Sequence, residues 1–91
     1  MKVIKISAIW CGACLIMNKH WNHLQNDYSF DAVELDYDMD EEEVKKYNPG
    51  NVLPVFIYMD NDEEVARYVG EVTYENLTTP LKGEKQDEED H

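Results

Sequence analysis

The 91-residue sequence is poor in positive charge and has no long hydrophobic run. Its 8 lysines and arginines stand against 20 aspartates and glutamates, which gives a net charge of −12. Such a surface repels nucleic acid and anionic membranes, so neither is an expected partner. No run approaches the roughly 20 apolar residues of a membrane-spanning helix, and Val3–Ile6 is too short for a secretory signal. We therefore expect a cytoplasmic protein.

Cysteine is equally scarce, because Cys11 and Cys14 are the only two in the chain. In a reducing compartment a purely structural disulfide between them is unexpected. A C-x-x-C pair otherwise serves reversible disulfide exchange or forms half of a zinc site. His20 and His23 follow on the same predicted helix, roughly 13–18 Å from Cys11 at 1.5 Å per residue. That separation disfavours zinc, and we expect no metal site.

The cysteine pair lies where a predicted strand, Lys2–Ala8, gives way to a predicted helix, Cys11–Gln25. Apolar residues recur there at helical spacing, at Cys14, Met17, Trp21 and Leu24. The first helical turn offers free N–H groups and about half a positive charge, which both favour a thiolate. We therefore expect Cys11 to be an exposed, acidic nucleophile, and Cys14 the buried thiol that resolves the mixed disulfide.

The segment Trp10-Cys11-Gly12-Ala13-Cys14 resembles the W-C-G-P-C motif of the thioredoxin family, with Ala13 in place of proline. Further matches follow along the chain. Val33–Asp38 is similar to the family's second strand, Leu53-Pro54 stands at its cis-proline, and Val69-Gly70 matches its V-G pair. The resemblance covers residues 3–81.

The resemblance implies an α/β thioredoxin-like fold, in which three helices flank a four-stranded mixed sheet in the order β-α-β-α-β-β-α. Because the cysteines come so early, we expect the minimal fold without the family's leading strand and helix. We assign residues 1–83 to this domain and expect a disordered acidic tail at 84–91.

The remaining elements are predicted from local patterns. They are a strand at Ala32–Asp36, a helix capped by Asp40 that stops at Asn48–Asn51, a hairpin of Val55–Met59 and Glu64–Val69, and a last helix capped by Thr73 that carries Leu77 and Leu81 and ends or kinks at Pro80.

By resemblance, the protein reduces protein disulfides by dithiol exchange, with the redox-active Cys11–Cys14 pair and no bound cofactor. Its electron donor would be a thioredoxin-reductase-type flavoenzyme, and we expect a monomer. The substrate-binding residues would be Trp10, Gly12, Ala13, Leu53, Pro54 and Gly70, with a cis bond before Pro54. Two alternatives stay open, a glutaredoxin-like enzyme and a non-catalytic redox-sensing or binding module.

The chain departs from the family at the proton acceptor. The family has a buried aspartate six residues before the first cysteine, where this chain has Lys5, and the family's lysine on the next strand aligns with Glu34. The two charges look exchanged. Lys5 and Glu34 either pair beneath Cys14, with Glu34 or a water on it taking the proton, or form an ordinary solvent-facing cross-strand pair.

Overall fold

The computed structural model describes residues 1–84, so almost all of the acidic tail predicted at 84–91 lies outside the described residues. Four strands form one mixed sheet in the order β2-β1-β3-β4. Strand β1 (Lys2–Ser7) is parallel to β2 (Asp31–Asp36) and antiparallel to β3 (Val55–Asp60), which is antiparallel to β4 (Glu63–Val69). The predicted mixed sheet and its strand order along the chain are confirmed.

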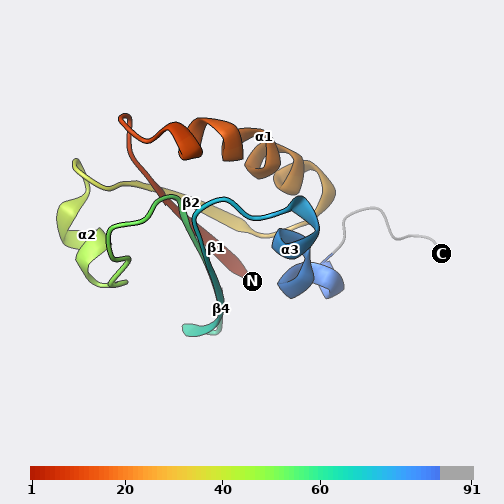
Figure 1. The fold of residues 1–91 in the computed structure, drawn as a ribbon. Helices are drawn as coiled ribbons and strands as arrows, with labels where there is room; N and C mark the ends of the chain where they lie inside the picture. Colours follow the sequence, from red (N-terminus) through yellow and green to blue (C-terminus); the bar gives the residue numbers. More distant parts are fainter. Residues whose placement is uncertain (85–91) are drawn as a thin grey trace.

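Three α-helices complete the fold, and they are α1 (Gly12–Asp27), α2 (Glu41–Lys45) and α3 (Tyr74–Thr78). A 3₁₀ helix, η1 (Thr79–Glu84), follows α3 directly. Figure 1 shows α2 and α3 on opposite sides of the strands, and α3 packs on the same face of the sheet as α1. The element order β-α-β-α-β-β-α is the predicted one.

The central strand β1 has apolar neighbours on both faces because its side chains alternate between two cores. Ile4 and Ile6 face the core that includes Val44 of α2. Val3 faces the core formed with α1, α3 and η1, whose other members are Met17, Trp21, Leu24, Phe56, Tyr58, Leu77 and Leu81. By the same alternation, Lys5 lies on the face covered by α1.

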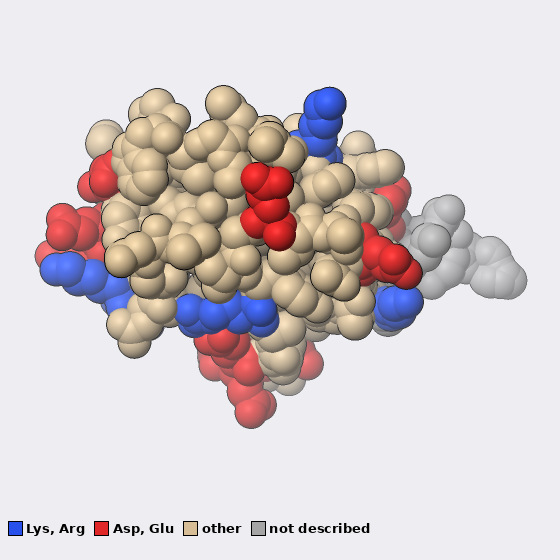
Figure 2. All heavy atoms as spheres, viewed as in Figure 1, with Lys and Arg blue, Asp and Glu red and all other residues tan. Residues whose placement is uncertain are grey.

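One face of the molecule carries few charged side chains. The face drawn in Figure 2 is mostly uncharged, with acidic and basic side chains gathered mainly toward its edges. This distribution leaves wide neutral surface on a chain whose net charge is −12.

Asp40 is the N-cap residue of α2, as predicted, but its carboxylate makes no capping hydrogen bond and instead accepts from the Asp36 N–H at 2.8 Å. One local prediction was wrong. Leu81 belongs to η1 and not to the last α-helix, because Pro80 has no N–H to continue the α-helical pattern. The helix therefore ends at Thr78 and tightens into a 3₁₀ turn.

The Tyr58 hydroxyl ties the sheet to α3. It donates to the Leu77 carbonyl oxygen at 2.7 Å within the core, and this carbonyl is in the last turn of α3, where no helical partner is available. We expect Tyr58→Phe to lower the free energy of unfolding by about 1–2 kcal/mol, because a buried acceptor is left unpaired. Denaturant unfolding measures this. Tyr68→Phe, which removes a hydroxyl from the half-buried ring beside Tyr58, is the matched control. Equal losses in the two variants would contradict the prediction.

Candidate active site

Cys11 is the N-cap of α1, and its own sulfur forms the cap. The backbone at Cys11 is extended (φ −94°, ψ 109°), and its Sγ accepts a hydrogen bond from the Cys14 N–H at 3.2 Å. The sulfur of Cys11 thus takes the role that the side-chain oxygen of serine or aspartate usually has at this position. The first-turn N–H and the helix dipole both point toward this sulfur, and both stabilise negative charge on it.

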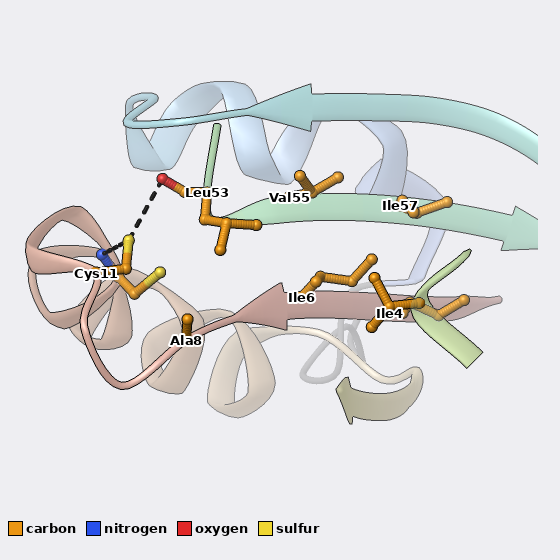
Figure 3. Close-up of a cluster of buried hydrophobic side chains, with 9 residues drawn as sticks. Ile4, Ile6, Ala8, Cys11, Leu53, Val55 and Ile57 are labelled. Carbon is orange, nitrogen blue, oxygen red and sulfur yellow. Dashed lines mark hydrogen bonds between the residues drawn. The ribbon is translucent and has the colours of Figure 1, made fainter. Parts of the chain in front are cut away.

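The prediction that Cys11 is exposed was wrong, since only 8% of its surface is accessible. Leu53 and Ala8 lie in the same apolar cluster, and Figure 3 shows Leu53 on the far side of the sulfur from Ala8. The Cys11 thiol donates to the Leu53 carbonyl oxygen at 3.5 Å. The loop before β3 therefore covers the nucleophile, a contact that the local sequence around Cys11 does not reveal.

Cys14 is buried as predicted, with its side chain in the same apolar cluster as Cys11. Burial is the main reason that the pKa of Cys14 rises from 9.0 to about 11, and the neighbouring Cys11 adds to the rise. A backbone hydrogen bond with Ala8 and the positive charge of Lys5 act in the opposite direction and lower the same pKa. At neutral pH Cys14 is therefore a thiol, and it must lose a proton before it can attack a disulfide.

Trp10 lies on the surface beside the cysteines, with 62% of its area exposed. Its indole N–H donates to Asp38 Oδ2 at 2.7 Å, and its ring contacts Tyr37 edge-on at 6.1 Å. The sequence reasoning missed both partners. The parallel pairing of β1 and β2 places the loops that follow them at one edge of the sheet, and that rule would have found them.

The other predicted substrate-binding residues gather at the same edge. The Leu53–Pro54 peptide bond is cis, as the resemblance implied. The N–H of Gly70 donates to the Pro54 carbonyl oxygen at 2.8 Å. Gly70 has φ +80°, a backbone conformation that residues with a side chain rarely adopt. Gly12 and Ala13 form the first turn of α1, where Gly12 is exposed with open space around it.

Lys5 and Glu34 form a pair with unequal exposure. The side chain of Lys5 is 5% exposed and that of Glu34 is 58% exposed, and the Lys5 Nζ lies 3.8 Å from Glu34 Oε1. Lys5 Nζ also donates to Asn18 Oδ1 at 2.5 Å. Trp21 contacts both charges, since its N–H donates to Glu34 Oε2 at 3.1 Å and its ring lies 5.7 Å from Lys5 Nζ.

A groove of about 470 Å³ connects this pair with the resolving thiol. It runs between α1 and β2, and its lining includes Lys5, Cys14, Asn18, Trp21, Glu34 and Asp36. Cys14 and Glu34 thus border one space that is large enough for several water molecules. The sequence analysis paired the two charges but did not identify Asn18, which lies one helical turn after Cys14.

The two histidines near the cysteines lie elsewhere on α1. His23 stacks on Tyr74 at 4.8 Å, and His20 contacts the same ring at 5.8 Å, at the junction of α1 with α3. Within residues 1–84, no three or more His, Cys, Asp or Glu side chains are grouped to hold a metal ion. No helix in this part of the chain is long and apolar enough to cross a membrane.

Solved structures of thioredoxins are similar to this fold. The thioredoxin of Schistosoma mansoni is 30% identical with a TM-score of 0.80, over 90% of this chain and 74% of that one. Thioredoxin-2 of a malaria parasite is 26% identical with a TM-score of 0.81, over 90% and 81%. A mutant thioredoxin from Halobacterium salinarum has a TM-score of 0.82 over 93% and 74%, and at 18% identity it supports the fold alone.

A search of curated protein sequences finds no significant match. The comparison with family models, in contrast, agrees with the structural comparison. The family model for thioredoxin matches residues 1–83, which is nearly the whole chain and includes the cysteine pair. This chain therefore belongs to the thioredoxin family.

Proposed function

We propose that the protein is a thiol-disulfide oxidoreductase that reduces protein disulfides through Cys11 and Cys14. The observation that carries this proposal is the Cys14 N–H bonded to Cys11 Sγ at 3.2 Å, at the start of a 16-residue helix. This bond holds the two cysteines of the pair together and stabilises the first sulfur as a thiolate.

The proposed reaction has two exchange steps. The Cys11 thiolate attacks a substrate disulfide, forms a mixed disulfide and releases one substrate sulfur as a thiolate. Cys14 loses its proton and attacks Cys11 Sγ, so that the Cys11–Cys14 disulfide forms and the second substrate sulfur leaves. The substrate gains two electrons and two protons. A thioredoxin-reductase-type flavoenzyme would then reduce the Cys11–Cys14 disulfide.

The substrate would dock at the sheet edge around Cys11. Once Cys11 Sγ is bonded to a substrate sulfur, it no longer donates to the Leu53 carbonyl oxygen, which can then accept a backbone N–H of the substrate. Trp10 offers an exposed aromatic face beside it, and Gly12, Ala13, Pro54 and Gly70 complete the proposed contact surface. The cytoplasmic location, the flavoenzyme donor and the monomeric state remain predictions.

Glu34 is the proposed acceptor of the Cys14 proton. Its carboxylate borders the groove that Cys14 also lines and is more than half exposed, so that a water can relay the proton and solvent can then remove it. Lys5, at 3.8 Å from Glu34, keeps the carboxylate turned toward the groove.

The first prediction concerns the two thiols. We expect Cys11→Ser to abolish reduction of a model protein disulfide, and Cys14→Ser to accumulate a mixed disulfide through Cys11, because the resolving sulfur is gone. Loss of reduction in Cys11→Ser is measured as turnover with dithiothreitol, a thioredoxin reductase or glutathione as electron donor. The choice of donor also distinguishes the glutaredoxin-like alternative. The mixed disulfide of Cys14→Ser is measured by the intact mass of the protein. Full turnover by Cys11→Ser would contradict the mechanism, and wild-type protein that binds a disulfide partner without reducing it would favour a binding module.

The second prediction concerns pH. Burial raises the pKa of Cys14 to about 11. As long as the pH is below that value, the thiolate fraction increases about tenfold for each unit by which the pH rises. We expect the resolving step to accelerate accordingly from pH 6 to 9. Single-turnover release of a chromophoric thiol from a preformed mixed disulfide at Cys11 measures it. A plateau below pH 9 would show that the thiol ionises far more readily than its burial implies.

The third prediction concerns the proton acceptor. We expect Glu34→Gln to slow the resolving step severalfold at pH 7, because an amide cannot take up the proton. Added imidazole should restore much of the rate, as a small base can reach the groove. Glu63→Gln, an exposed change on β4, is the control and should leave the rate unaltered. Equal rates for Glu34→Gln and wild type would exclude Glu34 as the acceptor.

A further inference from the structure

A lysine is buried in the sheet beside the resolving thiol, where an apolar side chain would pack more easily. Lys5 lies between Val3 and Ser7 on the face of β1 that α1 covers. Its side chain is only 5% exposed. Burying an ammonium group is energetically unfavourable unless its partners compensate for the lost hydration. A hydrophobic residue of similar size often serves stability as well or better. Structural stability alone therefore does not explain why a cation stands at this position.

The surroundings hold the ammonium group on the side of α1 that carries Cys14. Lys5 Nζ donates to Asn18 Oδ1 at 2.5 Å, and residues four apart on a helix lie on one face. Cys14 and Asn18 are such a pair, and both line the groove between α1 and β2. The short bond to Asn18 thus fixes the charge one helical turn from the resolving sulfur.

The described lining of the groove contains one cation and two acidic side chains. Among its described lining residues, Lys5 is the one basic side chain, while Glu34 and Asp36 of β2 are acidic. A thiolate at Cys14 therefore forms in a setting where Lys5 alone offers it an opposite charge.

We propose that the Lys5 ammonium stabilises the Cys14 thiolate that attacks the mixed disulfide, and that Asn18 is the positioning residue that holds the ammonium there. This inference rests on the proposed function and assigns the cation a role in its second step. Burial raises the pKa of Cys14, while a backbone hydrogen bond with Ala8 and the positive charge of Lys5 lower it, so the effect of Lys5 agrees in sign with this role.

Lys5 keeps its own proton throughout the step. The proton of Cys14 leaves through the groove toward Glu34 or solvent, and the electron pair on Cys14 Sγ forms the new bond to Cys11 Sγ. The bond between Cys11 and the substrate breaks, and its electron pair leaves with the substrate sulfur. Lys5 acts by charge alone, so that another permanent cation in its place would retain the effect, and a neutral side chain would not.

The test measures the ionisation of Cys14 directly, in a Cys11→Ser background where it is the sole thiol. The probe is iodoacetamide, a neutral alkylating reagent, and the measurement is its rate from pH 6 to 9. We expect Lys5→Met to displace this pH profile upward by about one unit, equivalent to about a tenfold lower rate at a given pH. Lys5→Arg should stay near the parent. Lys19→Met, an equal charge change on the exposed side of α1, should leave the profile in place.

The positioning role has its own variant. Asn18→Leu keeps the cation but removes its acceptor, and we expect a smaller upward displacement with the fold retained by circular dichroism. If Lys5→Met unfolds, Asn18→Leu and Lys5→Arg still decide the proposal. If Lys5→Met is folded and its profile is unchanged, the proposal is overturned. If only Asn18→Leu is folded, an unchanged profile in that variant overturns the proposal. A displacement in Lys5→Met without one in Asn18→Leu removes the role of Asn18.

The readout is independent of turnover. If the alkylation profile is displaced but the protein that retains both cysteines fails to reduce disulfides, the proposed function is rejected and the electrostatic role of Lys5 stands. An active protein with an unchanged profile would do the reverse.

Discussion

The hydrogen bond from the Cys14 N–H to Cys11 Sγ is the interaction on which the site depends. It makes one side chain both the cap of α1 and the proposed reacting group. A helix needs an acceptor for its free N–H groups, and a thiolate needs donors, so one contact meets both requirements. The sheet places this helix start at the C-terminal end of β1, where the loops before β3 and after β2 also lie.

Burial affects the two cysteines in different ways. Leu53 covers Cys11, but it does so with a carbonyl oxygen that accepts from the thiol, so that the cover is also a polar contact. Cys14 lies deeper, and burial raises its pKa to about 11. The two sulfurs are thus close in space, and the raised pKa of Cys14 suits it to act second.

Charge is organised on the α1 face of the sheet in an unusual way for a small core. Lys5 is buried, while its partner Glu34 reaches solvent, and Trp21 contacts both charges from α1. The cation therefore stays on the protein side of the groove and the carboxylate on the solvent side. This arrangement separates two tasks, the stabilisation of a thiolate and the removal of a proton, between two residues.

The sequence by itself determined the elements, because strands and helices follow from local periodicity and caps. The spacing of Cys14, Met17, Trp21 and Leu24 predicted α1, and the local pattern at Val55–Met59 predicted the first strand of a hairpin. The cysteine motif with Pro54 was sufficient to identify the family. Tertiary structure alone decided the burial of Cys11, because its cover is Leu53, 42 positions further along the chain. It also decided that Lys5 is buried against Asn18, since the exposure of a side chain depends on what the fold packs over it, and no local pattern records that.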